Sequence, residues 1–413
     1  MPEKKYPALR WITSAYTLLA IMAFGIFAVL LVPVAGYAAQ GGNEVDYQAV
    51  AEKLVLQCAG IQESDLVLIT GGVRNAELLE NIAVEVRKIG AFPLVTLQSD
   101  RMARRVYTDV PEKYDSQPPG FELQLANLIT ATIVVDHSEI MGVLKDIPAH
   151  RIAARNKAEV ELGQLRLKRK VRQVYLGEEN GLYPTHERAK LFAMSQEELS
   201  RLFWGGVNVD YSKLQKTGEV LKEVLADGKQ VHITNPNGTD LKVRIEGRPI
   251  FVSDGIISDR DVQSGGAACQ VWLPAGEVYT APVPGTAEGK VVIDRHLFRG
   301  REILGLTLTF KAGKLTSMTA KSGLEPLQAL YDASGPGKEL FGFIDIGINP
   351  NVRLLPDSRL VAFMPAGMVT VGVGGNTWAG GENEAPFALN GFLPGSTFKV
   401  DGQVLVEGGA LKP

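Results

Sequence analysis

The chain has 413 residues, of which 45% are hydrophobic, 22% charged and 7% aromatic. This length predicts roughly two or three domains, and the composition excludes a disordered or low-complexity chain. The net charge of −3 excludes the strongly basic balance typical of nucleic-acid-binding proteins, so no nucleic-acid partner is expected. Cys58 and Cys269 are too few for a disulfide framework. Export would allow one bridge, but we expect two small buried hydrophobic residues.

A hydrophobic segment near the N-terminus is the first predicted element. Three cations among the first ten residues precede an uncharged run over residues 11–39. As a helix this run can span a bilayer core of about 30 Å, with the N-terminus in the cytoplasm. Small residues such as Gly36 and Ala38 suit a signal peptidase, so a cleaved signal peptide and a retained membrane anchor both stay open, and the length of the run favours the anchor. The body from about Glu44 onward is therefore expected outside the cytoplasm, in the periplasm or at the cell surface.

The first half of this body has the pattern of an α/β protein. An apolar run followed by Gly71-Gly72, an amphipathic stretch and a second apolar run is typical of a βαβ unit, which predicts a parallel sheet with helices on its faces. The glycine pair lacks both phosphate-loop patterns and is interpreted as a plain turn. The predicted elements are a helix at residues 46–59, a strand at 65–70, a helix at 75–89, and strands at 92–97 and 128–135.

Residues 150–225 are predicted to be rich in helix. The basic cluster at residues 165–172 is interpreted as a solvated helix face. Thr185 is expected to cap a helix that follows it, and a further amphipathic helix is predicted at residues 211–226. Another feature to watch is Asp136-His137-Ser138, which follows the third strand at the sheet edge where ligands often bind, although a loop-capping role is favoured.

From residue 230 the pattern changes to short strands with glycine and proline between them. A hairpin is predicted over residues 231–245, and a helix at residues 324–333. The boundary near residue 228 predicts a leader at residues 1–41, an α/β domain at 42–228 and a β-rich α+β domain at 229–413. The later strands are expected at residues 291–294, 304–310, 315–320, 343–346, 359–363, 369–373 and 397–400.

Several stretches of the chain resemble one peptidase family. The most specific is Leu-Pro-Ala-Gly-Glu-Val-Tyr-Thr-Ala-Pro at residues 273–282, and others lie at residues 182–210, 228–245, 342–350, 369–383 and 398–405. They are similar to the aminopeptidase T and aminopeptidase S group of thermophilic metalloproteases, over residues from about 46 to the C-terminus. The resemblance implies two metal ions held between two domains, removal of N-terminal residues from peptides, and a homodimer. Such chemistry needs several carboxylate and histidine ligands.

The resemblance also assigns positions to the metal site. The first glutamate of the family matches Glu277, which is the only ligand of the set that survives. A second glutamate is replaced by Phe343, a histidine by Thr370, and a His-x-Asp pair by Ala388 and Asn390, while the tyrosine after that histidine lies at or next to Trp378.

The histidine count supports the loss of the site without any alignment. The chain has five histidines and none follows His296, whereas the metal histidines of the family all lie in the last third. The leading hypothesis is therefore a catalytically degenerate metallopeptidase, a pseudoenzyme that acts outside the cytoplasm in binding or assembly. It would need no cofactor, and would bind a peptide or small molecule through Glu277, Trp378 and glycine-loop amides.

An active enzyme is the alternative. Asp345 lies two residues after Phe343 and shares its strand face, so Glu277, Asp345, Glu382 and Asn390 are candidates to surround a rebuilt site. Such an all-oxygen set suits Ca²⁺ or Mg²⁺ better than Zn²⁺. A ring-opening iron dioxygenase on a related fold ranks last, because it also needs the missing His-x-Asp pair.

Overall fold

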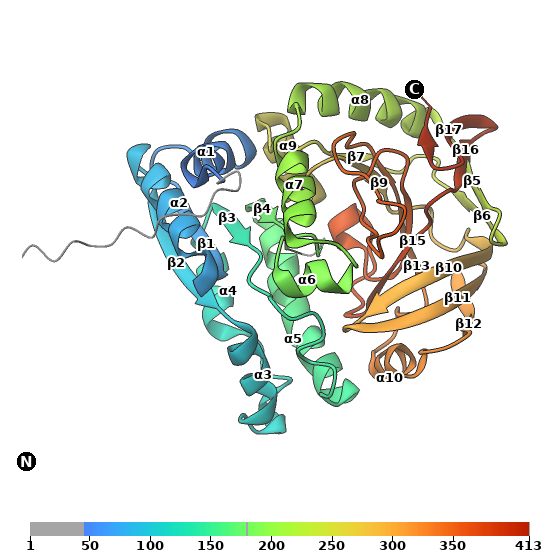
Figure 1. Ribbon diagram of the computed structural model, residues 1–413, viewed down its shortest axis with the longest axis horizontal. Helices are drawn as coiled ribbons and strands as arrows, with labels where there is room; N and C mark the ends of the chain where they lie inside the picture. Colours follow the sequence, from blue (N-terminus) through green and yellow to red (C-terminus); the bar gives the residue numbers. More distant parts are fainter. Residues whose placement is uncertain (1–44, 179–180, 413) are drawn as a thin grey trace, which may run out of the picture. The chain divides into compact units, whose positions relative to one another are not determined.

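The computed structural model describes residues 45–178 and 181–412. The chain from Val45 onward forms one compact unit (Figure 1). The hydrophobic segment expected at residues 11–39 lies outside the described residues, so its role as signal peptide or anchor stays a prediction. Within the two described ranges, no helix is both long enough and apolar enough to cross a membrane.

A five-stranded parallel sheet confirms the predicted βαβ unit. Its strand order is β2-β1-β3-β4-β8, and the labels of Figure 1 show β2 at one side of β1 and β3 at the other. β1, β3 and β4 are largely buried because they lie between neighbours and under helices, whereas β2 is an edge strand. The strands are β1 (Leu66–Gly72), β2 (Phe92–Gln98), β3 (Ala131–Val135), β4 (Arg172–Leu176) and β8 (Gln270–Leu273).

Helices pack on this sheet through spaced apolar residues. Leu78, Leu79, Ile82 and Val86 repeat at helical spacing on α2 and are fully buried in the core. The first helix begins at its N-cap Asp46, as predicted, and continues as a π-helical turn over Lys53–Cys58. The other helices of this half are α1 (Tyr47–Glu52), α2 (Ala76–Lys88), α3 (Asp100–Thr108), α4 (Gly120–Ala126), α5 (Ala149–Lys168), α6 (His186–Leu191), α7 (Gln196–Val207) and α8 (Tyr211–Asp227).

The second half forms two antiparallel sheets. An eight-stranded sheet has the order β12-β11-β10-β6-β5-β16-β17-β18, and a five-stranded sheet has the order β15-β14-β13-β9-β7. The helices among them are α9 (Asp259–Ser264) and α10 (Glu325–Ala333). The strands are β5 (Gln230–Asn235), β6 (Thr239–Arg244), β7 (Phe251–Ser253), β9 (Glu277–Thr280), β10 (Glu288–Phe298), β11 (Arg301–Lys311), β12 (Lys314–Thr319), β13 (Phe341–Gly347), β14 (Val369–Gly374), β15 (Ala388–Phe392), β16 (Thr397–Val400), β17 (Gln403–Glu407) and β18 (Ala410–Leu411).

Two expectations about secondary structure were wrong. The apolar run at residues 359–363 forms no strand, because it lies in a loop with no partner strand. The basic cluster at residues 165–172 is not one helix face: α5 ends at Lys168, and Arg172 begins β4 and pairs with Asp65 at 2.6 Å. The region at residues 150–225 therefore contains a strand of the parallel sheet, which sequence analysis missed. β8 also lies in this sheet, although it follows the predicted boundary near residue 228.

Other local predictions are confirmed. Thr185 caps α6, since its side chain accepts a hydrogen bond from the backbone N–H of Arg188 at 3.2 Å. Cys58 and Cys269 are both free and buried. Gly71, the next-to-last residue of β1, lies where a Cβ atom would be 2.8 Å from the side chain of Leu79, so close packing of α2 on the strand favours glycine there.

Asp136, the polar residue at the end of β3, is buried between two arginines. Its Oδ1 lies 2.9 Å from Arg74 and its Oδ2 lies 2.8 Å from Arg188, and its side chain is 3% exposed. Arg74 also packs over the Tyr183 ring at 5.0 Å, so this cluster joins the β1 and β3 ends to α6. Asp136 therefore holds this loop in place through its ion pairs with Arg74 and Arg188, which is a structural role.

We predict that Asp136→Asn lowers the free energy of unfolding by about 3 kcal/mol, because it removes the carboxylate that pairs with the buried guanidinium of Arg188 and with the half-buried guanidinium of Arg74. Chemical denaturation followed by tryptophan fluorescence measures the change. Asp240→Asn is the matched control, because Asp240 pairs with His232 at an exposed site. A loss from Asp136→Asn no larger than that from the control would contradict the prediction.

Candidate functional site

The five-stranded antiparallel sheet brings two carboxylates onto one face. Asp345 on β13 is opposite Tyr279 on β9 and opposite Thr370 on β14. Glu277 lies two residues before Tyr279, and residues two apart on a strand share a face. The register therefore places Glu277, Asp345 and Thr370 together, as expected for the first two from the sequence.

These two carboxylates are buried away from solvent. Glu277 is 5% exposed and Asp345 is 2% exposed. Burial raises the pKa of Asp345 well above its usual range, and the negative charge of Glu277 raises it further. The Ile346 amide and the Thr370 hydroxyl favour the charged form and oppose that rise only in part. Among the described residues, neither carboxyl oxygen of Asp345 makes a hydrogen bond of ordinary geometry.

Aromatic rings fill the space beside the carboxylates. The Trp378 ring centroid lies 4.7 Å from that of Phe343, 5.4 Å from that of Tyr279 and 5.5 Å from that of Trp272. Phe343 is held against Gly372 so closely that a Cβ atom there would overlap the phenyl ring. We call Trp272, Tyr279, Phe343 and Trp378 the aromatic cluster.

The remaining predicted positions are spread around the aromatic cluster. Trp378 lies in a short 3₁₀ turn, Thr377–Ala379, next to the cluster. Asn390 on β15 is opposite Gly372 and is half-buried, while Ala388 at the start of β15 is exposed. Glu382 is exposed and lines a separate hollow with Lys168 and Lys170. The structure thus brings Glu277 and Asp345 together and leaves Glu382 on the surface.

The residues present do not fit a pair of divalent cations. Two bridged cations need several carboxylate and imidazole ligands, and this face supplies Glu277 and Asp345, with the Thr370 hydroxyl as the next oxygen. Phe343 and Trp378 present ring carbon, and no metal-donor atom, beside these carboxylates. Within residues 45–178 and 181–412, no group of three or more His, Cys, Asp or Glu side chains is arranged to hold a metal ion.

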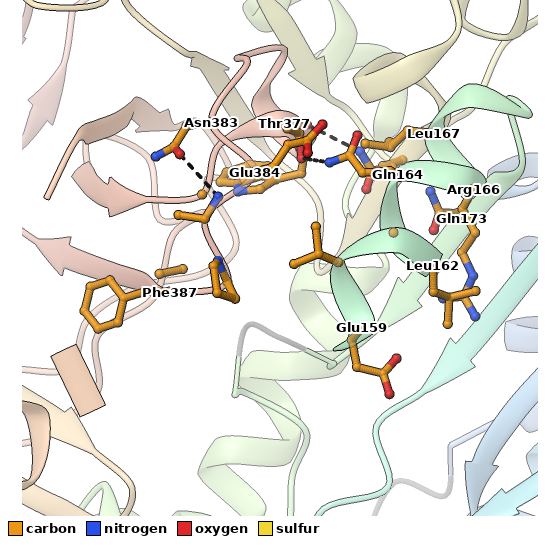
Figure 2. A pocket seen from close by; sticks show the side chains of 18 of the residues that line it. Glu159, Leu162, Gln164, Arg166, Leu167, Gln173, Thr377, Asn383, Glu384 and Phe387 are labelled. Carbon is orange, nitrogen blue, oxygen red and sulfur yellow. Dashed lines mark hydrogen bonds between the residues drawn. The ribbon is translucent and has the colours of Figure 1, made fainter. Parts of the chain in front are cut away.

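A cavity of about 390 Å³ opens beside the aromatic cluster (Figure 2). Its wall is built from two cross-strand pairs, because Gln173 and Tyr175 on β4 are opposite Gln270 and Trp272 on β8. The Tyr175 and Trp272 rings are stacked with an interplanar angle of 10°. Both glutamines are buried, at 3% and 6% exposure, so this wall presents carboxamides and flat rings to whatever enters.

The opposite wall comes from α5 and from the loop after β14. Figure 2 shows Gln164 reaching Thr377, and its Nε2 donates to the Thr377 Oγ1 at 2.9 Å. Asn383 accepts the Ala385 N–H at 3.2 Å and shapes the loop. Burial raises the pKa of Glu159 at the other end of the cavity, and the charge of Glu122 adds to that rise.

Sequence reasoning missed the residues of this cavity. Gln173 and Gln270 became neighbours only because β4 and β8, almost a hundred residues apart in sequence, pair in the parallel sheet. The run Val174-Tyr175-Leu176, which is rich in residues that favour strands, was a local signal that could have revealed β4. His137 lies elsewhere, with its Nδ1 3.5 Å from Glu178 Oε2, and burial lowers its pKa.

We predict that Asp345→Asn stabilises the fold at neutral pH. The folded chain keeps the Asp345 proton to a higher pH than the unfolded chain, so the unfolded chain loses its proton first as pH rises from about 4. Stability of the unsubstituted chain therefore falls over that range, and Asn removes the fall. The gain should be smallest near pH 4 and grow with pH in denaturation curves.

Glu382→Gln is the control for this pH dependence, because Glu382 is exposed. It should change stability little at any pH. A stability gain from Asp345→Asn that is the same at pH 4 and pH 8 would mean that the carboxyl proton plays no part.

Comparisons with known proteins agree with this architecture. Among solved structures, wild-type AmpT from Thermus thermophilus superimposes with a TM-score of 0.68 at 17% identity, covering 89% of this chain and 99% of that one. The 2,5-dihydroxypyridine dioxygenase from Pseudomonas putida KT2440 superimposes with a TM-score of 0.56 at 13% identity, covering 89% and 98%. At these identities both show a shared fold. No curated protein sequence was matched. The family model described as thermophilic metalloprotease (M29) matches residues 44–340, most of the chain, and the protein therefore belongs to the M29 family of thermophilic metalloproteases.

Proposed function

We propose that this protein is a catalytically degenerate member of the M29 family that acts outside the cytoplasm by binding a peptide or small molecule. The observation that carries the proposal is the aromatic cluster. Phe343 and Trp378 pack ring against ring, 4.7 Å apart, beside the buried Glu277 and Asp345. This face of the five-stranded antiparallel sheet, where the resemblance predicts metal ligands, carries apolar rings instead.

The chemistry of the remaining donors supports this proposal. Burial and the charge of Glu277 favour the protonated form of Asp345, which is a poor ligand for a cation. The sequence adds that no histidine follows His296, so no imidazole from the last third of the chain can complete a site. The chain therefore retains too few ligand groups to hold the two bridged cations that such peptide hydrolysis requires.

The cavity beside the aromatic cluster is where we place the ligand. Its carboxamides at Gln173 and Gln270 can pair with the N–H and C=O groups of a peptide, and Trp272 offers a flat apolar surface. A short peptide is the favoured ligand, because the family is one of proteases and peptide groups match carboxamides. The uncharged run at residues 11–39 supports an extracytoplasmic place of action, either secreted or anchored to the membrane.

One observation favours a second candidate function. Asp345 has no ordinary hydrogen bond to either carboxyl oxygen in the described part of the chain, and it shares a sheet face with Glu277. A single hard cation held by this pair would give the Asp345 oxygens a partner and would keep hydrolytic activity open. The exposed position of Glu382 argues against its joining such a site.

The decisive measurement is metal content together with aminopeptidase turnover of the purified full chain, with Co²⁺, Zn²⁺ and Mn²⁺ each in excess. We expect no stoichiometric metal and no turnover above that of Glu277→Ala. Stoichiometric metal with turnover that Glu277→Ala abolishes would overturn the degenerate assignment. Metal that binds without turnover, and is lost in Glu277→Ala, would mean that Glu277 and Asp345 hold a cation with a structural role only.

The binding role has its own test. A tripeptide with a free N-terminus, Leu-Gly-Gly, should change the fluorescence of the tryptophans beside the cavity. Gln173→Met should weaken this binding about fivefold, because one buried hydrogen-bonding group is worth about 1 kcal/mol. Gln124→Met on the exposed surface of α4 is the matched control. Equal affinities for both variants would remove the cavity as the peptide site.

A further inference from the structure

One arginine of the cavity beside the aromatic cluster has no counter-charge. Arg166 lines this cavity, its side chain is half-buried, and its Nε is buried with no acceptor among the described residues. Arg74 and Arg188 also have an Nε without an acceptor, but each pairs with Asp136. Arg166 forms no ion pair with any carboxylate in the described part of the chain. A partly desolvated guanidinium without a carboxylate partner is suited to bind an anion.

The position of Arg166 at the end of α5 does not explain this burial. Basic side chains in the last turn of a helix interact favourably with the helix dipole, and α5 ends with Arg166, Lys168 and the C-cap Arg169. Lys168 and Arg169 fill this role while they remain exposed to solvent. Arg166 differs from them because it lines the cavity, where its charge is less well solvated.

A second hydrogen-bond donor comes from the strand that follows α5. The Val171 N–H donates to the Arg166 carbonyl at 3.1 Å, so the chain turns directly from α5 into β4, and Gln173 follows two residues later. The Tyr175 hydroxyl donates to the Gln173 Oε1 at 3.0 Å, which leaves the Gln173 Nε2 as a donor without an acceptor in the described chain. Arg166 and Gln173 thus bring a cation and a neutral donor to the same end of the cavity, a combination that suits a carboxylate.

The opposite charge lies two turns earlier on the same helix. Glu159 precedes Arg166 by seven residues, so both lie on one face of α5, and both line the cavity (Figure 2). Seven residues of helix rise about 10 Å, which is also about the length of three extended peptide residues. Burial and the charge of Glu122 raise the pKa of Glu159, and the charge of Arg166 opposes that rise. Glu159 and Arg166 therefore interact electrostatically along this wall.

We propose that the cavity binds short free peptides of about three residues, with the C-terminal carboxylate on Arg166 and the N-terminal ammonium on Glu159. This assignment rests on the proposed function, because the same cavity is the peptide site. The Gln173 Nε2 donates to the same carboxylate. The Gln270 Oε1 accepts a peptide N–H, since the Gln270 Nε2 already donates to the Trp378 carbonyl at 3.3 Å. Intact proteins are excluded as ligands, because their third residue continues into an amide and has no carboxylate.

The test compares peptides that differ at one terminus, with the purified full chain and tryptophan fluorescence as the measure of binding. Leu-Gly-Gly-amide should bind about tenfold more weakly than Leu-Gly-Gly, because it loses the charge-assisted hydrogen bonds of the carboxylate. Arg166→Met should bind both peptides equally, at the affinity that the amide has for the unsubstituted chain. Arg169→Met is the matched control, because it removes an exposed arginine from the same helix end, and it should keep the tenfold difference.

The amino end of the peptide has a parallel test. N-acetyl-Leu-Gly-Gly should bind about threefold more weakly than Leu-Gly-Gly, a smaller effect because Glu159 is more exposed than Arg166 and exposed ion pairs are weak. Glu159→Gln should remove this difference. Glu384→Gln is the control, because Glu384 is an exposed acid of the same cavity that lies outside α5, and it should keep the difference.

The outcomes separate this assignment from the proposed function. Equal affinities of the unsubstituted chain for Leu-Gly-Gly and its amide would overturn the carboxylate site, and the proposed function would stand because both peptides bind. Binding of neither peptide would remove the cavity as a peptide site and this assignment with it. A tenfold difference that persists in Arg166→Met, in a variant whose thermal unfolding matches that of the unsubstituted chain, would overturn the role of Arg166.

Discussion

The complete burial of β13 is the constraint on which the rest of the second half depends. All seven residues of Phe341–Gly347 are buried, and the strand lies between β9 and β14. Alternation along such a strand sends Ile344 and Ile346 into the main core and Phe343 toward the aromatic cluster. A carboxylate at Asp345 must then share a desolvated face with rings and with Glu277.

That shared face explains both the energetics and the chemistry of the candidate site. Water cannot solvate Asp345, so its charged form is disfavoured and its pKa rises. Metallopeptidase sites offset such burial with cations, whereas here the neighbours are Phe343 and Trp378. Trp272 and Trp378 of the aromatic cluster also line the cavity, whose polar groups include the carboxamides of Gln173 and Gln270 and the charged side chains of Glu159, Arg166 and Glu384.

The parallel sheet links this site to the outer edge of the molecule. β8 at one end of the sheet carries Trp272 into the aromatic cluster, and β2 at the other end exposes an uncharged apolar strand. One end of this sheet thus forms a wall of the cavity, and the other end has an unpaired strand edge.

The sequence by itself determined the βαβ unit, the Thr185 cap, the β-rich second half and the family, because these follow from periodicity, turn residues and local motifs. It also placed Phe343 and Asp345 on one strand face, since strand alternation is local, whereas Glu277 comes beside them through the pairing of β9 with β13. Only the tertiary structure decided that Arg172 begins a strand, that Gln173 meets Gln270, and that residues 359–363 remain a loop. Strand pairing between distant segments, and burial itself, depend on neighbours that no local pattern contains.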